Sequence, residues 1–262
     1  MRKANVALSI DELGIGPAAV RQAKKLGAKA FVHYSIPSQI TRTLFINIRD
    51  LIEQECEKLG VEFIDTTVLD PTSDHGLIEA REFILKNVSE TVDEYGKDTA
   101  FFVANESLEP SLFSAVLEVG AICPHFSRTY NTYVEALAYA FDLEIGDNKN
   151  EEVLMQAKEL LNEMNMLGRI SSWADEYVFP LTIASADYAV KWINGEVPKE
   201  GVDREVLTQL ISDYVGVQTY LTPYIDVLNN RYSFADASGG SGEIYDNYLL
   251  MRMDYITVEE EL

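Results

Sequence analysis

The fold is decided by residues 28–68, which read AKAFVHYSIPSQITRTLFINIRDLIEQECEKLGVEFIDTTV. Both ends of this stretch, 29–34 and 61–68, are short runs rich in aromatic and β-branched residues, and this composition predicts two strands. Between them, residues 39–59 repeat apolar side chains at helical spacing, with charged residues outside the apolar stripe. The order strand, helix, strand predicts a βαβ unit with parallel strands.

The same alternation extends to both sides of this unit, up to about residue 145. Glycines follow four of the predicted helices, at Gly27, Gly60, Gly96 and Gly120, where this residue commonly ends a helix. The further strands are expected at 5–10, 99–104 and 121–123, and the further helices at 17–26, 78–95, 109–119 and 132–143. The sequence therefore predicts an α/β fold with a doubly wound, mostly parallel sheet.

The pattern changes after Gly146. Helices are expected at 151–167, 184–194 and 205–214, and the apolar runs 217–228 and 245–258 fit either strands or extended crossings. Residues 237–242 have the composition of a flexible loop, and the acidic tail 259–261 that of a solvated end. We therefore expect an α/β ligand-binding lobe over 1–146 and a more helical part over 147–262.

Charge narrows the range of partners. The chain has 262 residues with 43 acidic and 21 basic side chains, a net charge of −22, of which −13 falls on 151–262 and −9 on 1–150. This surplus repels phosphate backbones and anionic lipids, so we expect no nucleic-acid partner. No apolar run approaches the roughly 20 residues that span a bilayer, so we expect no membrane insertion. The basic start of the chain leads into a strand and not into an apolar export signal.

One glycine motif imitates a cofactor site. Residues 14–19, GIGPAA, match the dinucleotide fingerprint G-x-G-x-x-A after a predicted strand. However, Asp11 and Glu12 directly precede the motif, and no ribose-binding carboxylate follows the second strand at about 20 residues' distance. We therefore expect no nucleotide cofactor, and a phosphate-binding P-loop is also absent from the sequence.

Histidine and cysteine give no strong signal for a metal or for a nucleophile. His33, His75 and His125 are the only histidines and are scattered, without the helical H-E-x-x-H spacing. Cys123 and His125 are too close along the chain for a typical nucleophile and base pair. The sequence leaves open whether Cys56 and Cys123 pair, since they form no C-x-x-C motif.

Polar side chains gather where the predicted strands end. Ligands of open parallel sheets bind outside the carboxyl ends of the strands, although polar residues are also common in any loop. The candidate ligand-binding residues are Ser9, Asp11, His33, Tyr34, Ser35, Thr66, Thr67, Asp70, Asn105, Glu106 and His125. Trp173, Tyr177 and Phe179 could stack on a ligand or simply pack.

Several segments resemble a known family. The runs 28–37, 56–63, 70–72 and 95–102, and more weakly 168–173 and 254–257, are similar to a bacterial family of unknown function whose members are extracytoplasmic and often lipoprotein-like. That family is related to the type I periplasmic binding proteins. The resemblance implies a two-lobed protein that clasps a small molecule, and it brings no catalytic residues.

The sequence departs from that pattern at its start, because no set of strand–helix units precedes Asn5. We therefore expect the chain to correspond to the second lobe and the C-terminal part, with the first lobe absent or supplied separately. The resemblance also implies an extracytoplasmic location and a membrane permease as a further partner.

Three functions follow as alternatives. The leading prediction is non-catalytic binding or sensing of a polar small molecule, without a cofactor or a metal. The second is an α/β enzyme that uses Asp70, Glu106 or His125 for acid–base chemistry at the same sheet edge. The third is a regulatory domain that dimerises through its acidic second half.

Overall fold

The computed structural model describes residues 4–126, 137–138, 140–144, 149–174, 177–227, 230–232 and 243–257. The chain divides into two compact units. One comprises Met1–Ile15 and Ala174–Asp254, and the other comprises Gly16–Trp173 and Tyr255–Leu262. We call them unit 1 and unit 2. The predicted loop 237–242, the tail 259–261 and half of the predicted helix 132–143 lie outside the described residues.

Unit 2 contains the βαβ unit that the opening stretch predicts. Strands β2 (Ala30–Ser35), β3 (Glu62–Thr67) and β4 (Thr99–Val103) form a parallel sheet in the order β3-β2-β4. Two parallel bridges, Ala100 to Ile122 and Cys123 to Ile170, continue the sheet toward β5 (Ser171–Trp173). There β5 pairs antiparallel with β9 (Tyr255–Thr257). The structure thus confirms an α/β fold with a mostly parallel sheet.

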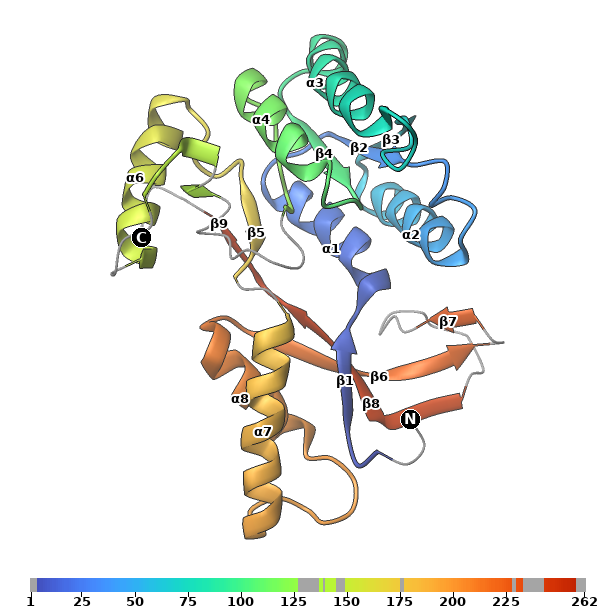
Figure 1. The fold of residues 1–262 in the computed structure, drawn as a ribbon, viewed down its shortest axis with the longest axis vertical. Helices are drawn as coiled ribbons and strands as arrows, with labels where there is room; N and C mark the ends of the chain where they lie inside the picture. Colours follow the sequence, from blue (N-terminus) through green and yellow to red (C-terminus); the bar gives the residue numbers. More distant parts are fainter. Residues whose placement is uncertain are drawn as a thin grey trace. The chain divides into compact units, whose positions relative to one another are not determined.

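Helices cover both faces of this sheet (Figure 1). The helices α1 (Glu12–Lys25) and α2 (Thr43–Leu59) lie on one face, and α3 (Gly76–Tyr95) and α4 (Glu109–Val119) lie on the other. The core on the α3 and α4 side joins Val32 and Phe101 of the strands to Ile84 and Val116 of the helices. The predicted ends of two helices are confirmed, because Gly60 and Gly120 adopt left-handed conformations with φ of 63° and 73°.

Helix α6 (Lys149–Glu163) also belongs to unit 2. Its residues Val153, Ala157 and Leu161, spaced four apart, are fully buried in the same core cluster. The unit therefore extends to Trp173 and does not end at residue 146, where the sequence pattern changes. The change of pattern after Gly146 therefore does not mark the end of unit 2, because the buried face of α6 joins the core of that unit.

Unit 1 has its own mixed sheet, in the order β1-β8-β6-β7. Its strands are β1 (Ala7–Ile10), β6 (Thr219–Val227), β7 (Asn230–Tyr232) and β8 (Glu243–Met253), and its helices are α7 (Val178–Asn194) and α8 (Arg204–Val215). The two late apolar runs are thus mainly strands. Asp203 caps α8, because its side chain accepts a hydrogen bond from the backbone N–H of Val206.

The place of the first strand differs from the sequence-based expectation. Residues 5–10 were expected in the same parallel sheet as 29–34, but β1 pairs in parallel with β8, from Ala7 opposite Tyr248 to Ile10 opposite Met251. The residue pattern of a strand indicates that it is extended and partly buried, but not which strand will pair with it. β1 therefore belongs to unit 1 and does not extend the sheet of unit 2.

Candidate functional site

The carboxyl edge of the unit 2 sheet begins with a polar cluster on β2 and β3. His33 and Ser35 lie on one face of β2, and both are buried. The register of the parallel pair places His33 opposite Asp65. His33 Nδ1 lies 2.9 Å from Asp65 Oδ1, and the Ser35 hydroxyl donates to the same oxygen at 2.5 Å. Arg49, on α2, approaches the other carboxylate oxygen at 3.7 Å.

These contacts keep Asp65 ionised. Burial is the largest single effect and acts to raise its pKa, but the hydrogen bonds from His33 and Ser35, with the charges of His33 and Arg49, outweigh burial and lower the pKa. An ionised carboxylate only accepts hydrogen bonds, so Nδ1 of His33 carries the proton that points to Asp65. The cluster therefore fixes the orientation of the imidazole.

The three residue types of a hydrolytic triad are present, but their arrangement differs. In a triad, the serine and the carboxylate contact opposite nitrogens of the histidine ring. Here Ser35 Oγ lies 3.3 Å from Nδ1, the nitrogen that also faces Asp65. The Ser35 hydroxyl donates its hydrogen bond to Asp65. It therefore does not donate to the histidine ring, as a serine nucleophile would.

A row of rings continues across the sheet from this cluster. His33 stacks on Phe102 of β4 with centroids 6.1 Å apart, and Phe102 in turn lies 6.1 Å from the ring of His125. His125 is buried and meets Trp173 and Tyr255 edge-on, at 5.5 Å and 5.6 Å. The row thus connects strands that are far apart in the sequence. The sequence left open whether Trp173 stacks on a ligand or packs in the protein, and here it packs against His125.

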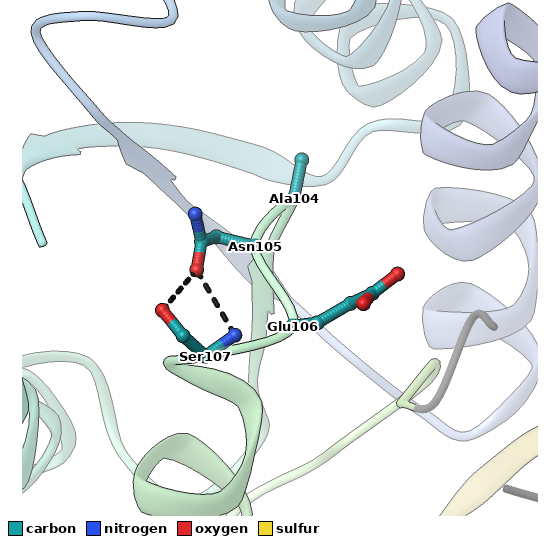
Figure 2. Close-up of a pocket in the computed structure, with 4 residues that line it drawn as sticks. All are labelled: Ala104, Asn105, Glu106 and Ser107. Atoms are coloured by element: carbon teal, nitrogen blue, oxygen red, sulfur yellow. Dashed lines mark hydrogen bonds between the residues drawn. The ribbon is translucent and has the colours of Figure 1, made fainter. Parts of the chain in front are cut away.

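The end of β4 forms an open depression of about 330 Å³, lined by Ala104, Asn105, Glu106 and Ser107. The side-chain oxygen of Asn105 accepts hydrogen bonds from the Ser107 backbone N–H at 3.0 Å and from the Ser107 hydroxyl at 2.6 Å. Figure 2 shows that the amide nitrogen of Asn105 points away from Ser107 and that the carboxylate of Glu106 projects away from this pair. The depression therefore presents an amide donor and a carboxylate acceptor.

Two predicted site residues have structural roles instead. Tyr34 lies in the core beneath α3, where its hydroxyl donates to Asn87 at 2.9 Å, and burial raises its pKa. Asp70 is half-buried and organises the turn after β3. Its carboxylate accepts from the backbone N–H and the hydroxyl of Thr72, and hydrogen bonds from Ser38 and Thr72 lower its pKa to about 2.

The remaining predicted residues are divided between the units. Thr66 and Thr67 end β3 beside the polar cluster, whereas Ser9 and Asp11 lie at the end of β1 in unit 1. The structure therefore does not place Ser9 and Asp11 on the same sheet edge as the others. Asp11 is buried, accepts a hydrogen bond from Gly14 N at 3.1 Å at the start of α1, and pairs with Arg252 at 3.4 Å.

The glycines of the dinucleotide-like motif are explained by packing within the chain. A Cβ atom at Gly14 would lie 2.3 Å from the Asp11 carboxylate, and one at Gly16 would lie 2.7 Å from Ile52. A larger residue at either position would therefore have to displace a neighbouring side chain. The space that the fingerprint leaves for a pyrophosphate is occupied at Gly14 by an acidic group, which does not fit that ligand.

Sequence reasoning missed Asp65, Arg49 and Tyr255. Asp65 shares one face of the predicted strand with Phe63 and Thr67, since side chains two residues apart point the same way, so a carboxylate on that face was a usable signal. Tyr255 reaches His125 from the far end of the chain, which no local pattern shows. Among the described residues, no group of three or more histidines, cysteines or acidic residues is arranged to hold a metal ion.

Within the described part of the chain, no helix is both long and apolar enough to cross a membrane. The chain is 28% identical over 134 residues to an "Uncharacterized protein" of Treponema pallidum (strain Nichols), a match that covers 51% of this chain and 61% of the relative. The fold is similar to a crystal structure described as a "Putative transcriptional regulator from Clostridium difficile 630". That match has a TM-score of 0.75 and 16% identity, and covers 96% of this chain and 66% of the other.

The chain thus spans just under two thirds of the length of both relatives. The likeness to the crystal structure, at 16% identity, supports the fold. A protein-family model matches residues 1–171, well over half of the sequence. The protein therefore belongs to the family described as "Protein of unknown function (DUF3798)".

Proposed function

We propose that this protein binds a polar small molecule at the carboxyl edge of the unit 2 sheet, as a solute-binding or sensing protein. The observation that carries the proposal is the depression at the end of β4, where Asn105 and Glu106 present a hydrogen-bond donor and a carboxylate. A position at the ends of parallel strands is the usual one for ligands of such sheets. The proposal includes a relationship to type I periplasmic binding proteins, with an extracytoplasmic location and a permease as partner.

The charge of the site narrows the ligand class. Glu106 lines the depression, and the chain carries a net charge of −22, so an anionic ligand meets repulsion. A neutral molecule rich in hydroxyl groups can accept a hydrogen bond from the Asn105 amide and donate one to Glu106. A cation can pair with the Glu106 carboxylate. We therefore expect sugars, nucleosides, or amino acids and peptides with a basic group to bind in preference to phosphates and dicarboxylates.

Binding is favoured over acid–base catalysis by the direction of the pKa shifts. A general acid at neutral pH needs a raised carboxyl pKa. The two carboxyl groups with shifted pKa values near this edge, Asp65 and Asp70, are both shifted downward by hydrogen bonds and neighbouring charges. An enzyme that uses Glu106 or His125 remains the alternative, and turnover of a bound compound would identify it.

A regulatory role is the second candidate. The observation in its favour is the fold shared with the protein described as a "Putative transcriptional regulator". In that role the small molecule would act as an effector that shifts the population of two conformations. Sensing and regulation therefore require the same ligand site, and the first experiment is common to both.

The test is a thermal-shift screen of the purified chain against sugars, nucleosides, amino acids, short peptides and phosphorylated compounds, followed by calorimetry of the hits. A ligand at 100 times its dissociation constant stabilises the folded state by about 2.7 kcal/mol, enough to raise Tm by several degrees. Glu106→Gln weakens binding of a cationic hit at least tenfold, whereas Glu118→Gln, an exposed change on α4, leaves it unchanged. If no compound class stabilises the chain, the proposal is wrong.

A further inference from the structure

The loop at the end of β4, residues 104–107, is held by side chains from two other elements. Gln39, in the loop after β2, donates from its side-chain amide to the carbonyl of Ala104 at 3.2 Å. Arg81, on α3, donates from Nε and Nη2 to the carbonyl of Ser107, at 3.1 Å and 2.8 Å. All of these residues belong to unit 2. Both ends of this short loop are therefore fixed by residues that lie far away in the sequence.

The contact of Arg81 is the stronger of the two anchors. Two donors of one guanidinium reach the same carbonyl oxygen, and a hydrogen bond from a charged donor is stronger than one between neutral groups. The planar guanidinium also loses little freedom for each hydrogen bond that it forms. Arg81 is half-buried on α3, the helix that packs against α4. The guanidinium thus ties the end of the loop to a helix of the core.

The position of Ser107 decides which atom of Asn105 the depression presents. The backbone N–H and the hydroxyl of Ser107 both donate to Asn105 Oδ1, at 3.0 Å and 2.6 Å (Figure 2). A backbone N–H can only donate, so the Asn105 atom that faces it is the oxygen and not the nitrogen. The acceptor of the Asn105 amide is therefore used inside the loop, and its donor remains for a ligand.

We propose that Arg81 and Gln39 are positioning residues that determine the specificity of this site through the loop. They hold the loop in the shape that keeps Asn105 Oδ1 turned to Ser107, so that the site offers a donor beside the Glu106 carboxylate. A ligand must then carry an acceptor for the Asn105 amide next to a cationic or hydroxyl group for Glu106. This inference rests on the proposed function and adds to it the residues that set the ligand class.

The first experiment needs no ligand. Arg81→Met and Gln39→Met remove the donors and keep a long side chain, and NMR follows amide hydrogen exchange in the unliganded chain. The reference is the amide of Phe31, a fully buried residue of β2. In both variants we expect exchange of the Ser107 amide to accelerate about tenfold more than that of Phe31, and the Asn105 side-chain signals to move. Equal acceleration of both amides would show a general loss of stability and overturn the proposal.

Two further variants separate charge from geometry. Lys86→Met also removes a positive charge from α3, but Lys86 is exposed and pairs with Glu90 at 3.4 Å, so this variant leaves the exchange of the Ser107 amide unchanged. Arg81→Lys keeps the charge without the planar fork and restores part of the slow exchange. If Lys86→Met has the same effect as Arg81→Met, the charge of α3 is responsible and the contact with Ser107 is not, which also overturns the proposal.

The second experiment tests specificity with two small probes, glycinamide and n-propylamine. Both are cations at neutral pH, but only glycinamide has a carbonyl acceptor for the Asn105 amide. In NMR titrations we expect the wild-type protein to bind glycinamide at least about threefold more tightly than n-propylamine, and Arg81→Met to bind both equally. A preference that Arg81→Met retains overturns the role in specificity. If neither probe shifts the Asn105 and Glu106 signals of the wild-type protein, the proposed function fails, and the exchange rates still decide whether Arg81 holds the loop.

Discussion

His33 and Asp65 lie opposite each other on the neighbouring parallel strands β2 and β3, with His33 Nδ1 2.9 Å from Asp65 Oδ1. Ser35 donates to the same carboxylate oxygen from two residues further along β2. One partly exposed carboxylate thus satisfies two buried polar side chains at the edge where we propose that a ligand binds. The pairing ties the local chemistry of this edge to the register of the sheet.

Replacing the carboxylate tests this coupling. Asp65→Asn removes the charge that Ser35 and His33 contact, and we expect a loss of about 1 kcal/mol at pH 7, reduced by the solvent exposure of the group. The pKa of Asp65 is lowered by folding, so its contribution is present above the ordinary carboxyl pKa and is lost as the pH falls below it. Urea unfolding of the variant and wild type at pH 7 and near pH 3 measures this difference, which shrinks in acid. An equal loss in Asp93→Asn, an exposed site on α3, would contradict the prediction.

The turn at Asp70 gives a spectroscopic prediction. Hydrogen bonds from the Ser38 side chain and from Thr72 lower the pKa of Asp70 to about 2. Thr72→Val removes the hydroxyl donor and keeps the backbone N–H, so the pKa rises part of the way toward the usual value. The carboxyl chemical shift of Asp70, followed by NMR against pH, gives the titration midpoint in the wild-type protein and in the variant. An unperturbed midpoint in the wild-type protein would show that the turn does not hold this carboxylate.

Gly16 is expected to be required for the packing of α1 on α2. A methyl group at this position would lie 2.7 Å and 2.9 Å from Ile52 side-chain carbons, so Gly16→Ala lowers stability by about 1–3 kcal/mol through overpacking. Shortening the neighbour in the double variant Gly16→Ala, Ile52→Val restores part of the loss. Thermal unfolding of the two single variants and the double variant provides the cycle. Additive losses would mean that the two residues do not compete for space.

The two cysteines are expected to be unreactive. Cys56 and Cys123 are free and buried, and burial raises both thiol pKa values, that of Cys56 to about 12. A thiol reacts as its thiolate, so neither residue is alkylated in the folded protein at pH 7.5. After iodoacetamide treatment, we expect mass spectrometry to detect no modification of the folded protein and two modifications of the protein unfolded in urea. Modification of Cys123 without urea would show that its part of the core opens readily.

The elements of the fold could be predicted largely from local patterns. Helix α4 was expected at 109–119 and is found at Glu109–Val119, because its apolar spacing and the following glycine are both local signals. Strands β2, β3 and β4 were each placed within one or two residues for the same reason. The extent of each unit was less accessible, since α6 joins unit 2 through a buried face whose partner is elsewhere in the sequence.

The candidate site also combines features that the local sequence predicts with features that depend on distant contacts. The sequence by itself determined that polar side chains follow the strands and that the chain is strongly acidic. The helix expected at 17–26 begins earlier, at Glu12, so Gly14 and Gly16 lie inside α1 and not before it. Only the tertiary structure decided that Asp65 faces His33, that Tyr255 and Trp173 enclose His125, and that Ser9 and Asp11 belong to the other unit. Periodicity fixes which residues share the face of an element. Strand partners and register depend on packing between distant segments, which local sequence does not encode.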